Sequence, residues 1–384
     1  MTEQEAYIAL NLINGIGPAR LNILKSRFET AEKILHAPEE ALAALPGVGK
    51  VLAEKIAHWE KYADLAGELD LAEKGGVKIV TLADEEYPSV LRELRDAPLC
   101  LYVRGDLPVN IGERSLAVVG TRSMSHYGNR MARHLSEAAA YAGFTIISGL
   151  AYGVDACAHR AALDAGGRTV SVLGGGLARI QPQDHVPLAR EIVEKGGAVI
   201  SEFPMETMPT RHTFPMRNRI ISGLSTGVLV VEAGLNSGSL ITANFALEQN
   251  RTLFAVPGQA DDPNAAGCNS LIRQGAVLVE CFDHILEEFE FLPGFTSGRN
   301  MIREERAVFK EEVPEGAGED SAQPVEDDPG GKILAVLREE KTASLEILAE
   351  KSGLPAGELS SLLIMLELER RIVRLDSGLY RLKM

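Results

Sequence analysis

The residues best suited to binding a ligand lie in one segment, Thr207–Val231, which contains no Asp or Glu although the whole chain has a formal net charge of −15. Its cations are Arg211, Arg217 and Arg219, and Phe214 lies among them. Arginines beside an aromatic ring suit single-stranded nucleic acid, because the cations follow the phosphates and a base stacks on the ring for about 1–3 kcal/mol. The same residue types also suit a protein interior, where the ring is core and the arginines form structural ion pairs. Residue types alone leave both interpretations open.

Four turns at the ends of predicted strands could approach an anion through their backbone. A glycine after a strand lets N–H groups reach a phosphate, and the start of the following helix favours negative charge. Several such turns on one sheet edge predict a phosphate-binding rim, and Arg122 and Arg273 fall at predicted loop edges that would extend it. The turns are Gly120-Thr-Arg-Ser123, Ser148-Gly-Leu-Ala-Tyr-Gly153, Gly174-Gly-Gly-Leu177 and Pro215-Met-Arg-Asn-Arg219.

The familiar cofactor and enzyme motifs are missing from the sequence. Gly174-Gly-Gly-Leu-Ala-Arg179 breaks G-x-G-x-x-G at its last position, and Gly49-Lys50 lacks the Walker spacing, so neither NAD nor ATP binding is supported. No His, Cys or Asp cluster has metal-ligand spacing, and no G-x-S-x-G elbow occurs. We therefore expect no cofactor, no metal and no catalytic residue.

The elements that must position these residues form an α/β pattern. Short apolar runs alternate with helix-length segments such as 127–142 and 154–165. This alternation predicts a parallel sheet covered on both faces, whose ligands bind at the carboxyl ends of the strands. The predicted strands are 116–119, 145–147, 169–173, 198–200, 227–231, 252–255 and 276–279.

Two smaller parts flank the sheet domain, which we place at residues 67–291 with a connector at 67–113. Residues 1–66 are predicted to be helical, with two glycine-containing hairpins at 10–24 and 42–56. They resemble the helix-hairpin-helix motif, which can grip a DNA phosphate through backbone N–H groups. A module that merely packs remains the alternative.

The C-terminal part is predicted as an acidic linker, 292–330, and a winged-helix domain, 331–384. The linker holds about half of the net charge. The domain pattern consists of helices at about 331–340, 344–352 and 355–370, then a hairpin turning at Asp376-Ser-Gly378. Acidic side chains on the third helix would repel DNA, so a protein contact is favoured over DNA reading; they are Glu358, Glu367 and Glu369.

Length and composition limit the number of domains and the cellular location that we expect. A chain of 384 residues suits two or three domains. Its longest apolar stretches are too short to span a bilayer, and the acidic start lacks the features of a signal peptide. The four cysteines form no C-x-x-C pair, which predicts reduced thiols in the cytoplasm.

A series of ordered motifs runs through the sheet region. The strings are Ala117-Val-Val-Gly-Thr-Arg122, Ser148-Gly-Leu-Ala-Tyr-Gly-Val-Asp155 with Ala158-His159, Val172-Leu-Gly-Gly-Gly-Leu177, Ser201-Glu-Phe-Pro204, Phe214-Pro-Met-Arg-Asn-Arg-Ile-Ile221, Val230-Val-Glu-Ala233, Ser237-Gly-Ser-Leu-Ile-Thr-Ala243, Ala255-Val-Pro-Gly258 and Gly267-Cys-Asn-Ser-Leu-Ile272. These strings resemble those of the DprA/Smf family (DNA processing protein A), and their order and spacing cover residues 87–290. The resemblance implies an α/β fold, in which an extended Rossmann-like parallel sheet domain is flanked by a helix-hairpin-helix (SAM-like) module and a winged helix.

The resemblance implies a cytoplasmic single-stranded-DNA-binding protein, without membrane association or enzymatic activity. It would protect incoming strands and load the recombinase RecA during natural transformation, as a homodimer formed through the Rossmann-like domain. Apolar residues 276–289 are a candidate dimer face. After the glycine triplet the family usually has Tyr-Pro and later Asn, whereas this chain has Gln181-Pro-Gln-Asp-His185, so we expect the contacts of that loop to differ.

The resemblance also implies a role for each residue of the DNA site. Arg122 and Arg211 would contact phosphates, and Phe214 would contact a base. Arg219 could instead be structural and pair with Glu202 or Glu232. Backbone or hydroxyl donors would be Ser148, Gly149, Gly174, Gly175 and Gly176, and the pocket would be lined or buttressed by Arg217, Asn218 and Arg219.

Two rival functions come from other classes of protein. A Rossmann-like nucleotide phosphoribohydrolase would use Glu232 and Arg219 as catalytic residues, but its usual Pro-Gly-Gly-x-Gly-Thr turn is replaced by Gly234-Leu-Asn-Ser-Gly-Ser239. A ligand-sensing transcription regulator would read DNA through the winged helix, which the acidic third helix disfavours.

Overall fold

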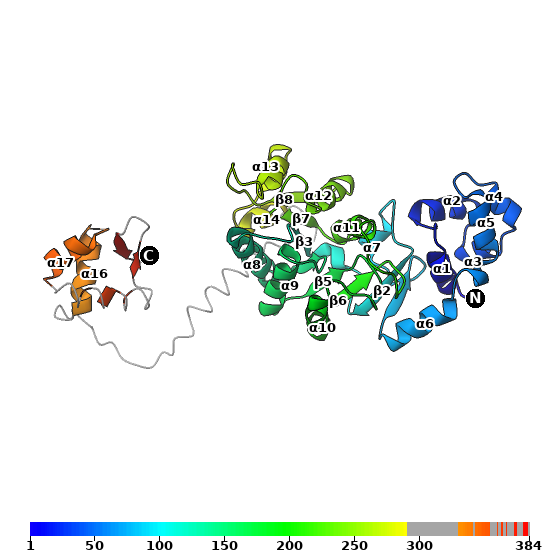
Figure 1. The fold of residues 1–384 in the computed structure, drawn as a ribbon, viewed down its shortest axis with the longest axis horizontal. Coiled ribbons are helices and arrows are strands. Elements are labelled where there is room, and N and C mark those ends of the chain that lie inside the picture. Colours follow the sequence, from blue (N-terminus) through cyan, green and yellow to red (C-terminus); the bar gives the residue numbers. More distant parts are fainter. Residues whose placement is uncertain are drawn as a thin grey trace. The chain divides into compact units, whose positions relative to one another are not determined.

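The computed structural model describes residues 1–289 and parts of the C-terminal region. Its chain divides into two compact units, Met1–Val308 and Phe309–Met384 (Figure 1). Nearly all of the predicted linker, most of the predicted third helix with its three glutamates, and the turn at 376–378 lie outside the described residues. The described C-terminal residues are 329–340, 342–353, 359, 362–363, 366, 372–374 and 379–382.

A nine-stranded sheet forms the centre of the first unit, with the order β1-β2-β6-β5-β4-β3-β7-β8-β9. From β6 to β9 in this order, all neighbouring strands are parallel. All seven predicted strands are confirmed to within two residues at each end. They are β3 Ser115–Val119, β4 Thr145–Ser148, β5 Thr169–Val172, β6 Ala198–Ser201, β7 Gly227–Val230, β8 Thr252–Ala255 and β9 Val277–Leu278.

The connector predicted at 67–113 is wrong, because this segment contributes two more strands, β1 Lys78–Thr81 and β2 Cys100–Gly105. Both pair antiparallel, β1 with β2 and β2 with β6, so the sheet is mixed rather than purely parallel. The outer edge of β1 is occupied by side chains. Gln4 donates to Ile79 O at 3.0 Å, and Asp84 accepts from Thr81 N at 2.7 Å.

Helices cover both faces of the sheet because alternate strand residues point to opposite sides. Leu116 and Val118 face one layer of helices, whereas Ala117 and Val119 face the other. The first layer contains α8 His126–Tyr141, α9 Val154–Asp164 and α14 Phe282–Phe289, and the second contains α11 Thr213–Gly223, α12 Ser239–Glu248 and α13 Ala266–Arg273. In the candidate dimer face 276–289, Phe282, Ile285 and Phe289 of α14 are buried in the core, whereas Leu278 of β9 is 40% exposed.

The N-terminal module packs against the β1–β2 end of the sheet (Figure 1). Its two glycine turns are joined by Arg20, which donates to Gly47 O at 3.0 Å and also to Gly15 O. Arg20 therefore holds the two hairpins together. The helices are α1 Glu3–Leu12, α2 Pro18–Phe28, α3 Ala31–Leu35, α4 Glu39–Ala43, α5 Gly49–Ala57 and α6 Leu65–Lys74.

The second unit has its own apolar core, to which Leu359, Leu363 and Leu366 contribute. Its helices α16 Pro329–Glu340 and α17 Leu345–Ser352 match two of the predicted helices, and β10 Ile372–Arg374 pairs antiparallel with β11 Tyr380–Leu382 as the predicted hairpin. Among the described residues, no helix is both long enough and apolar enough to cross a membrane.

Candidate nucleic-acid interface

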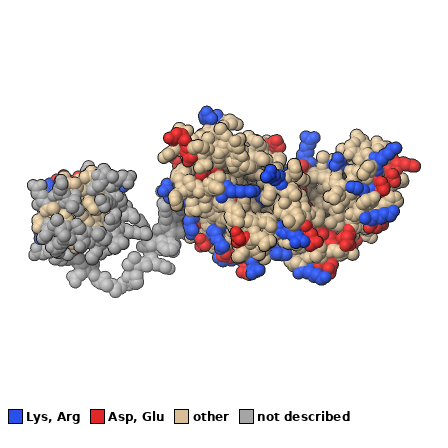
Figure 2. Space-filling model, viewed as in Figure 1, with Lys and Arg blue, Asp and Glu red and all other residues tan. Residues whose placement is uncertain are grey.

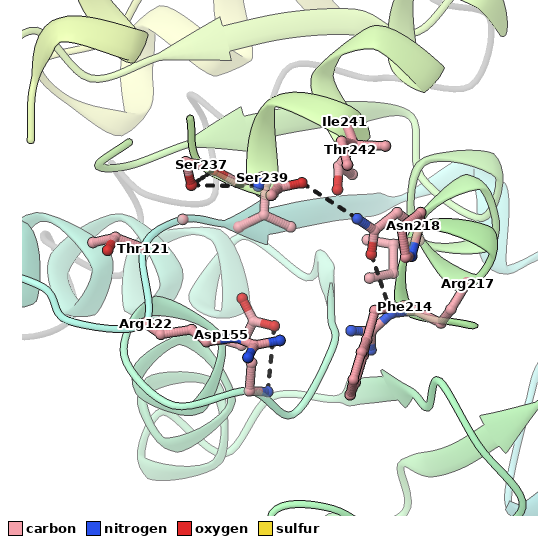
Figure 3. A pocket seen from close by; sticks show the side chains of 16 residues that line it. Thr121, Arg122, Asp155, Phe214, Arg217, Asn218, Ser237, Ser239, Ile241 and Thr242 are labelled. Carbon is pink, nitrogen blue, oxygen red and sulfur yellow. Dashed lines mark hydrogen bonds between the residues drawn. The ribbon is translucent and has the colours of Figure 1, made fainter. Parts of the chain in front are cut away.

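A cavity of about 340 Å³ opens at the carboxyl ends of β3 and β7 (Figure 3). The strand order reverses between these two strands, and such a switch point is where open α/β sheets bind ligands. The walls come from the turn after β3, the turn after β4, helix α11 and the start of α12. The labelled lining residues are Thr121, Arg122, Asp155, Phe214, Arg217, Asn218, Ser237, Ser239, Ile241 and Thr242.

Phe214 has two arginine neighbours of different character. The guanidinium carbon of Arg122 is 5.2 Å from the centre of the ring, and that of Arg217 is 5.9 Å from it. Arg122 is exposed, whereas Arg217 is buried. The ring also covers Gly174, where a Cβ atom would lie 2.8 Å from ring atom Cδ1. The cavity therefore combines a half-buried aromatic ring with one cation that solvent and a ligand can reach.

Arg217 joins the turns after β4 and β5 to helix α11. Its guanidinium donates to Gly149 O at 2.7 Å and to Val172 O, and its Nε donates to Asn218 Oδ1 at 3.2 Å. Burial lowers the pKa of Arg217 to about 10, against a smaller upward effect of Asp155. Arg217 thus remains charged at neutral pH and acts as a buttress rather than as an exposed contact.

Asp155 holds the glycine-rich turn after β4 from the opposite side. Its carboxylate accepts from Gly149 N at 3.2 Å and from Ala151 N at 3.4 Å. Burial raises the pKa of Asp155, and nearby Arg217 partly offsets this rise. These N–H groups, which the sequence suggested for an anion, are already occupied. Asp155 was not predicted as a site residue. The sequence feature that could have identified it is its place in one of the matching strings, which the structure puts in the first turn of α9.

Several predicted donors lie behind the cavity and do not line it. The hydroxyl of Ser148 is buried and donates to Val118 O at 2.7 Å. The glycines 174–176 are buried beneath the loop from Pro204 to Pro209 and beneath Phe214, where side chains would not fit. Gly176 N donates to Thr207 O at 2.9 Å. These residues shape the cavity through close packing.

The remaining predicted arginines separate into three positions. Arg219 is buried, pairs with Glu202, and has its Nε 3.4 Å from Asp96 Oδ2, so pairing with Glu202 is confirmed and pairing with Glu232 is wrong. Arg211 is exposed in the loop before α11, at the cavity edge of the sheet. Arg273 is exposed at the end of α13, just before the chain enters β9, and thus lies at the opposite, amino edge.

The start of α12 adds hydroxyl groups that the site prediction omitted. Ser237 Oγ and Ser239 Oγ are 2.8 Å apart, and Asn218 Nδ2 donates to Gly238 O at 3.4 Å (Figure 3). Hydroxyls and N–H groups at a helix start suit phosphate oxygens. These serines stand in the string 237–243, so their signal was present, but only the fold brings them opposite Arg122.

The unusual loop 181–185 contacts the turn after β4 and does not line the cavity. Tyr152 Oη donates to Asp184 Oδ2 at 2.8 Å, and His185 Nδ1 lies 2.8 Å from Leu150 O. His159, which belongs to a matching string, is also away from the cavity. It is fully buried, with Nδ1 2.7 Å from Thr169 Oγ1, and burial lowers its pKa to about 3. It is a core residue.

The charge on the face in Figure 2 is not uniform. Blue Lys and Arg side chains lie across the region of β3 and α11, whereas many of the red acidic side chains lie towards the periphery. Within the described residues, no group of three His, Cys, Asp or Glu side chains could hold a metal ion.

The fold and the cavity define a Rossmann-like α/β protein with a candidate ligand site at the carboxyl edge of its sheet. The chain belongs to the DprA/Smf family: the model described as DNA recombination-mediator protein A matches residues 78–290. A SAM-like helix-hairpin-helix tandem matches 8–57, and a DprA winged helix domain matches 317–378. By family, the chain is a DNA-processing recombination mediator.

Related proteins are similar to this chain over most of its length. Protein Smf of Escherichia coli (strain K12) is 42% identical over 302 residues, which are 78% of this chain and 76% of that protein. Protein Smf of Synechocystis is 35% identical and covers 96% of both chains. The X-ray structure of DNA processing protein A from Streptococcus pneumoniae superposes with a TM-score of 0.64 at 31% identity, covering 76% of this chain and 99% of that one.

Proposed function

We propose that the cavity at β3 and β7 binds single-stranded DNA. The observation that carries the proposal is the ring of Phe214, with exposed Arg122 above it and the hydroxyls of Ser237 and Ser239 opposite. A base can stack against the ring while the cation and hydroxyls meet the adjacent phosphates. A volume of about 340 Å³ suits a single nucleotide, and a base paired in a duplex cannot enter it.

We further propose that the bound strand is protected and passed to the recombinase RecA, without chemical change, by a homodimer in the cytoplasm. Membership of a family of recombination mediators supports this role. The open edge strand β9, where Leu278 is 40% exposed, supports pairing through the sheet domain. The buried, unpaired thiols of Cys100 and Cys268 fit a reducing compartment.

The test is fluorescence anisotropy with labelled oligo-dT and with a duplex of equal length, over a salt series. We expect preference for the single strand, with a log–log salt slope of about −0.7 per phosphate neutralised. Arg122→Ala should reduce the magnitude of that slope by about 0.7. Arg273→Ala removes the same charge from an exposed arginine at the other edge of the sheet and should change nothing, so it is the matched control.

Phe214→Leu separates stacking from charge in the same assay. Leucine keeps apolar contact with Gly174 but removes the aromatic face, so affinity should fall by about 1–3 kcal/mol while the salt slope stays constant. Equal binding of duplex and single strand, or equal effects of Arg122→Ala and Arg273→Ala, would contradict the proposal. Sequence-specific duplex binding would instead favour a regulator, and release of free base from nucleoside monophosphates would favour an enzyme.

The RecA proposal has its own experiment. Purified protein should speed the formation of RecA filaments on single strands already covered by a single-strand-binding protein, and Arg122→Ala should remove most of that acceleration. Tight strand binding without any acceleration would leave the DNA site standing and reject the loader role.

A further inference from the structure

A second cavity, of about 760 Å³, opens at the same sheet edge on the side of helix α8. Its walls come from the start of α8, the residues after β7 and the residues after β8. Thr121 N donates to Glu232 O at 2.7 Å, and this backbone hydrogen bond joins the strand ends that separate the two cavities. Both hollows therefore belong to the switch point of the sheet, although their chemistry differs.

The polar centre of the second cavity is the carboxylate of Glu232, whose side chain is buried. Oε2 accepts from Ser125 N at 3.1 Å and from Ser125 Oγ at 2.8 Å, whereas Oε1 accepts only a longer bond, 3.2 Å, from the same N–H. Gly128 makes room for this arrangement, because a Cβ atom there would overlap Oε2. A carboxylate offers about four lone-pair sites, so Oε1 keeps acceptor capacity.

The walls around this carboxylate suit a flat ring. Val231, Val256 and Pro257 are apolar, and Tyr127 closes one side by donating from its hydroxyl to Pro257 O at 2.8 Å. The guanidinium carbon of Arg130 lies 5.6 Å from the centre of the Tyr127 ring. The cavity thus combines an acceptor at its base, apolar and aromatic walls, and a cation at its rim.

We propose that this cavity binds one nucleotide unit through the exocyclic amino group of its base. The amino group of cytosine, adenine or guanine would donate to Glu232 Oε1, and the phosphate would lie next to Arg130. Carboxylates accept from such amino groups, whereas thymine has none and presents carbonyl oxygens that the carboxylate repels. The nucleotide unit is either part of a bound strand or a free nucleotide. In the first case the inference rests on the proposed function.

The experiment compares all-dT oligonucleotide with the same oligonucleotide carrying one central dC, using the full chain. Wild type should bind the dC strand about ten- to a hundredfold more tightly, the effect of one hydrogen bond to a charged acceptor. Glu232→Gln should abolish or reverse this preference. The new carbonyl oxygen can accept from Ser125, which turns the amide NH2 towards the cavity, where it suits a thymine carbonyl.

Arg130→Ala tests the rim, with Arg133→Ala as its matched control. Arg133 lies on the same helix, but it pairs with Glu137 at 2.8 Å and Asp164 at 2.8 Å and does not line the cavity. Arg130→Ala should reduce the preference for dC, and Arg133→Ala should not. The two variants should have the same effect on binding of the all-dT oligonucleotide. If melting curves show that Glu232→Gln does not fold, the dC preference of Arg130→Ala and Arg133→Ala tests the proposal instead.

Competition with dCMP identifies the source of the nucleotide. If dCMP removes the dC preference and leaves all-dT binding intact, a free nucleotide enters the cavity; if the preference persists, only a strand-linked base does, and both results support the inference. Equal affinity of wild type for dC and dT strands overturns it, as does equal loss in the two arginine variants. Because all-dT binding and its dependence on Arg122 are measured separately, failure here leaves the first cavity unaffected.

Discussion

At the scale of single residues, Arg122 and Arg217 share one aromatic neighbour but differ in burial, and they should respond differently to the same substitution. Arg217→Lys leaves one ammonium to replace a guanidinium that reaches Gly149 O and Val172 O, and lysine pays a higher cost for desolvation. We expect the free energy of unfolding to fall by about 2 kcal/mol or more. Arg122→Lys should change it by no more than about 0.5 kcal/mol. Urea denaturation measures both, and equal small effects would show that Arg217 is not a buttress.

His159 predicts a pH dependence of stability. Its pKa is about 3 in the folded chain and about 6.5 when unfolded, so between these values the unfolded state binds a proton that the folded state does not. The stability contributed by neutral His159 is therefore lost as pH falls below about 6.5, by at most about 1.4 kcal/mol per pH unit. His159→Asn keeps a donor for Thr169 and should flatten the pH profile by that amount. His58→Asn, at an exposed histidine, should leave the profile unchanged.

Residue types predicted part of the candidate site and missed part for a physical reason. Phe214 stood out because a ring among arginines is conspicuous in an acid-free segment, and Arg122 stood out because it follows a glycine turn at the end of a predicted strand. Asp155 and Ser239 did not, since their place in the cavity depends on which turns meet at the sheet edge. Arg219 has the same type as Arg211, and only the nearby carboxylates of Glu202 and Asp96 decide that it is structural.

At the scale of elements, the turns after β3 and β4 fit together through one glycine. Gly153 has φ +75°, and a Cβ atom there would overlap Thr121 O and crowd the backbone of Arg122. Gly153→Ala should therefore cost about 2 kcal/mol or more and weaken oligo-dT binding, because the Arg122 turn must move. Gly238→Ala is the control for stability, since its φ is −61° and no atom lies within 4 Å of the added Cβ. Thermal unfolding and anisotropy read the two effects, and an unaffected Gly153→Ala would mean that the turns move independently.

The seven parallel strands were predictable because each is a short apolar run before a helix-length segment. The two antiparallel strands were not predictable, because β1 begins with exposed Lys78 and only the four-residue helix α7 Ser89–Arg92 separates it from β2. Pairing of β2 with β6 joins residues about a hundred positions apart, which local periodicity does not encode. The burial of Phe282 and Phe289 against Phe144 was hidden for the same reason.

At the scale of the whole molecule, the N-terminal module and the sheet share one apolar core. Tyr7 and Leu10 belong to the same buried cluster as Tyr102 and Leu173, and Asn11 Nδ2 donates to Glu202 O at 3.2 Å. We expect a truncated chain of residues 67–384 to expose this surface and to melt at lower temperature or aggregate. A chain of residues 1–289 should keep both the melting temperature of the first unit and oligo-dT binding, since all cavity residues lie within it. Calorimetry measures the melting temperatures, and anisotropy measures DNA binding. If the 67–384 chain is stable, the contact between the N-terminal module and the sheet does not stabilise the sheet.

The side chains of Gln4 and Asp84 on the edge of β1 also limit how copies of this chain can assemble. A sheet with two free edges can add copies at both ends and grow into a fibre. Here one edge is capped, and among the described residues the free edge is β9, so a twofold pairing there would consume the free edge of both copies. Growth through the sheet would then stop at two molecules, which would protect a strand-rich protein from open-ended polymerisation.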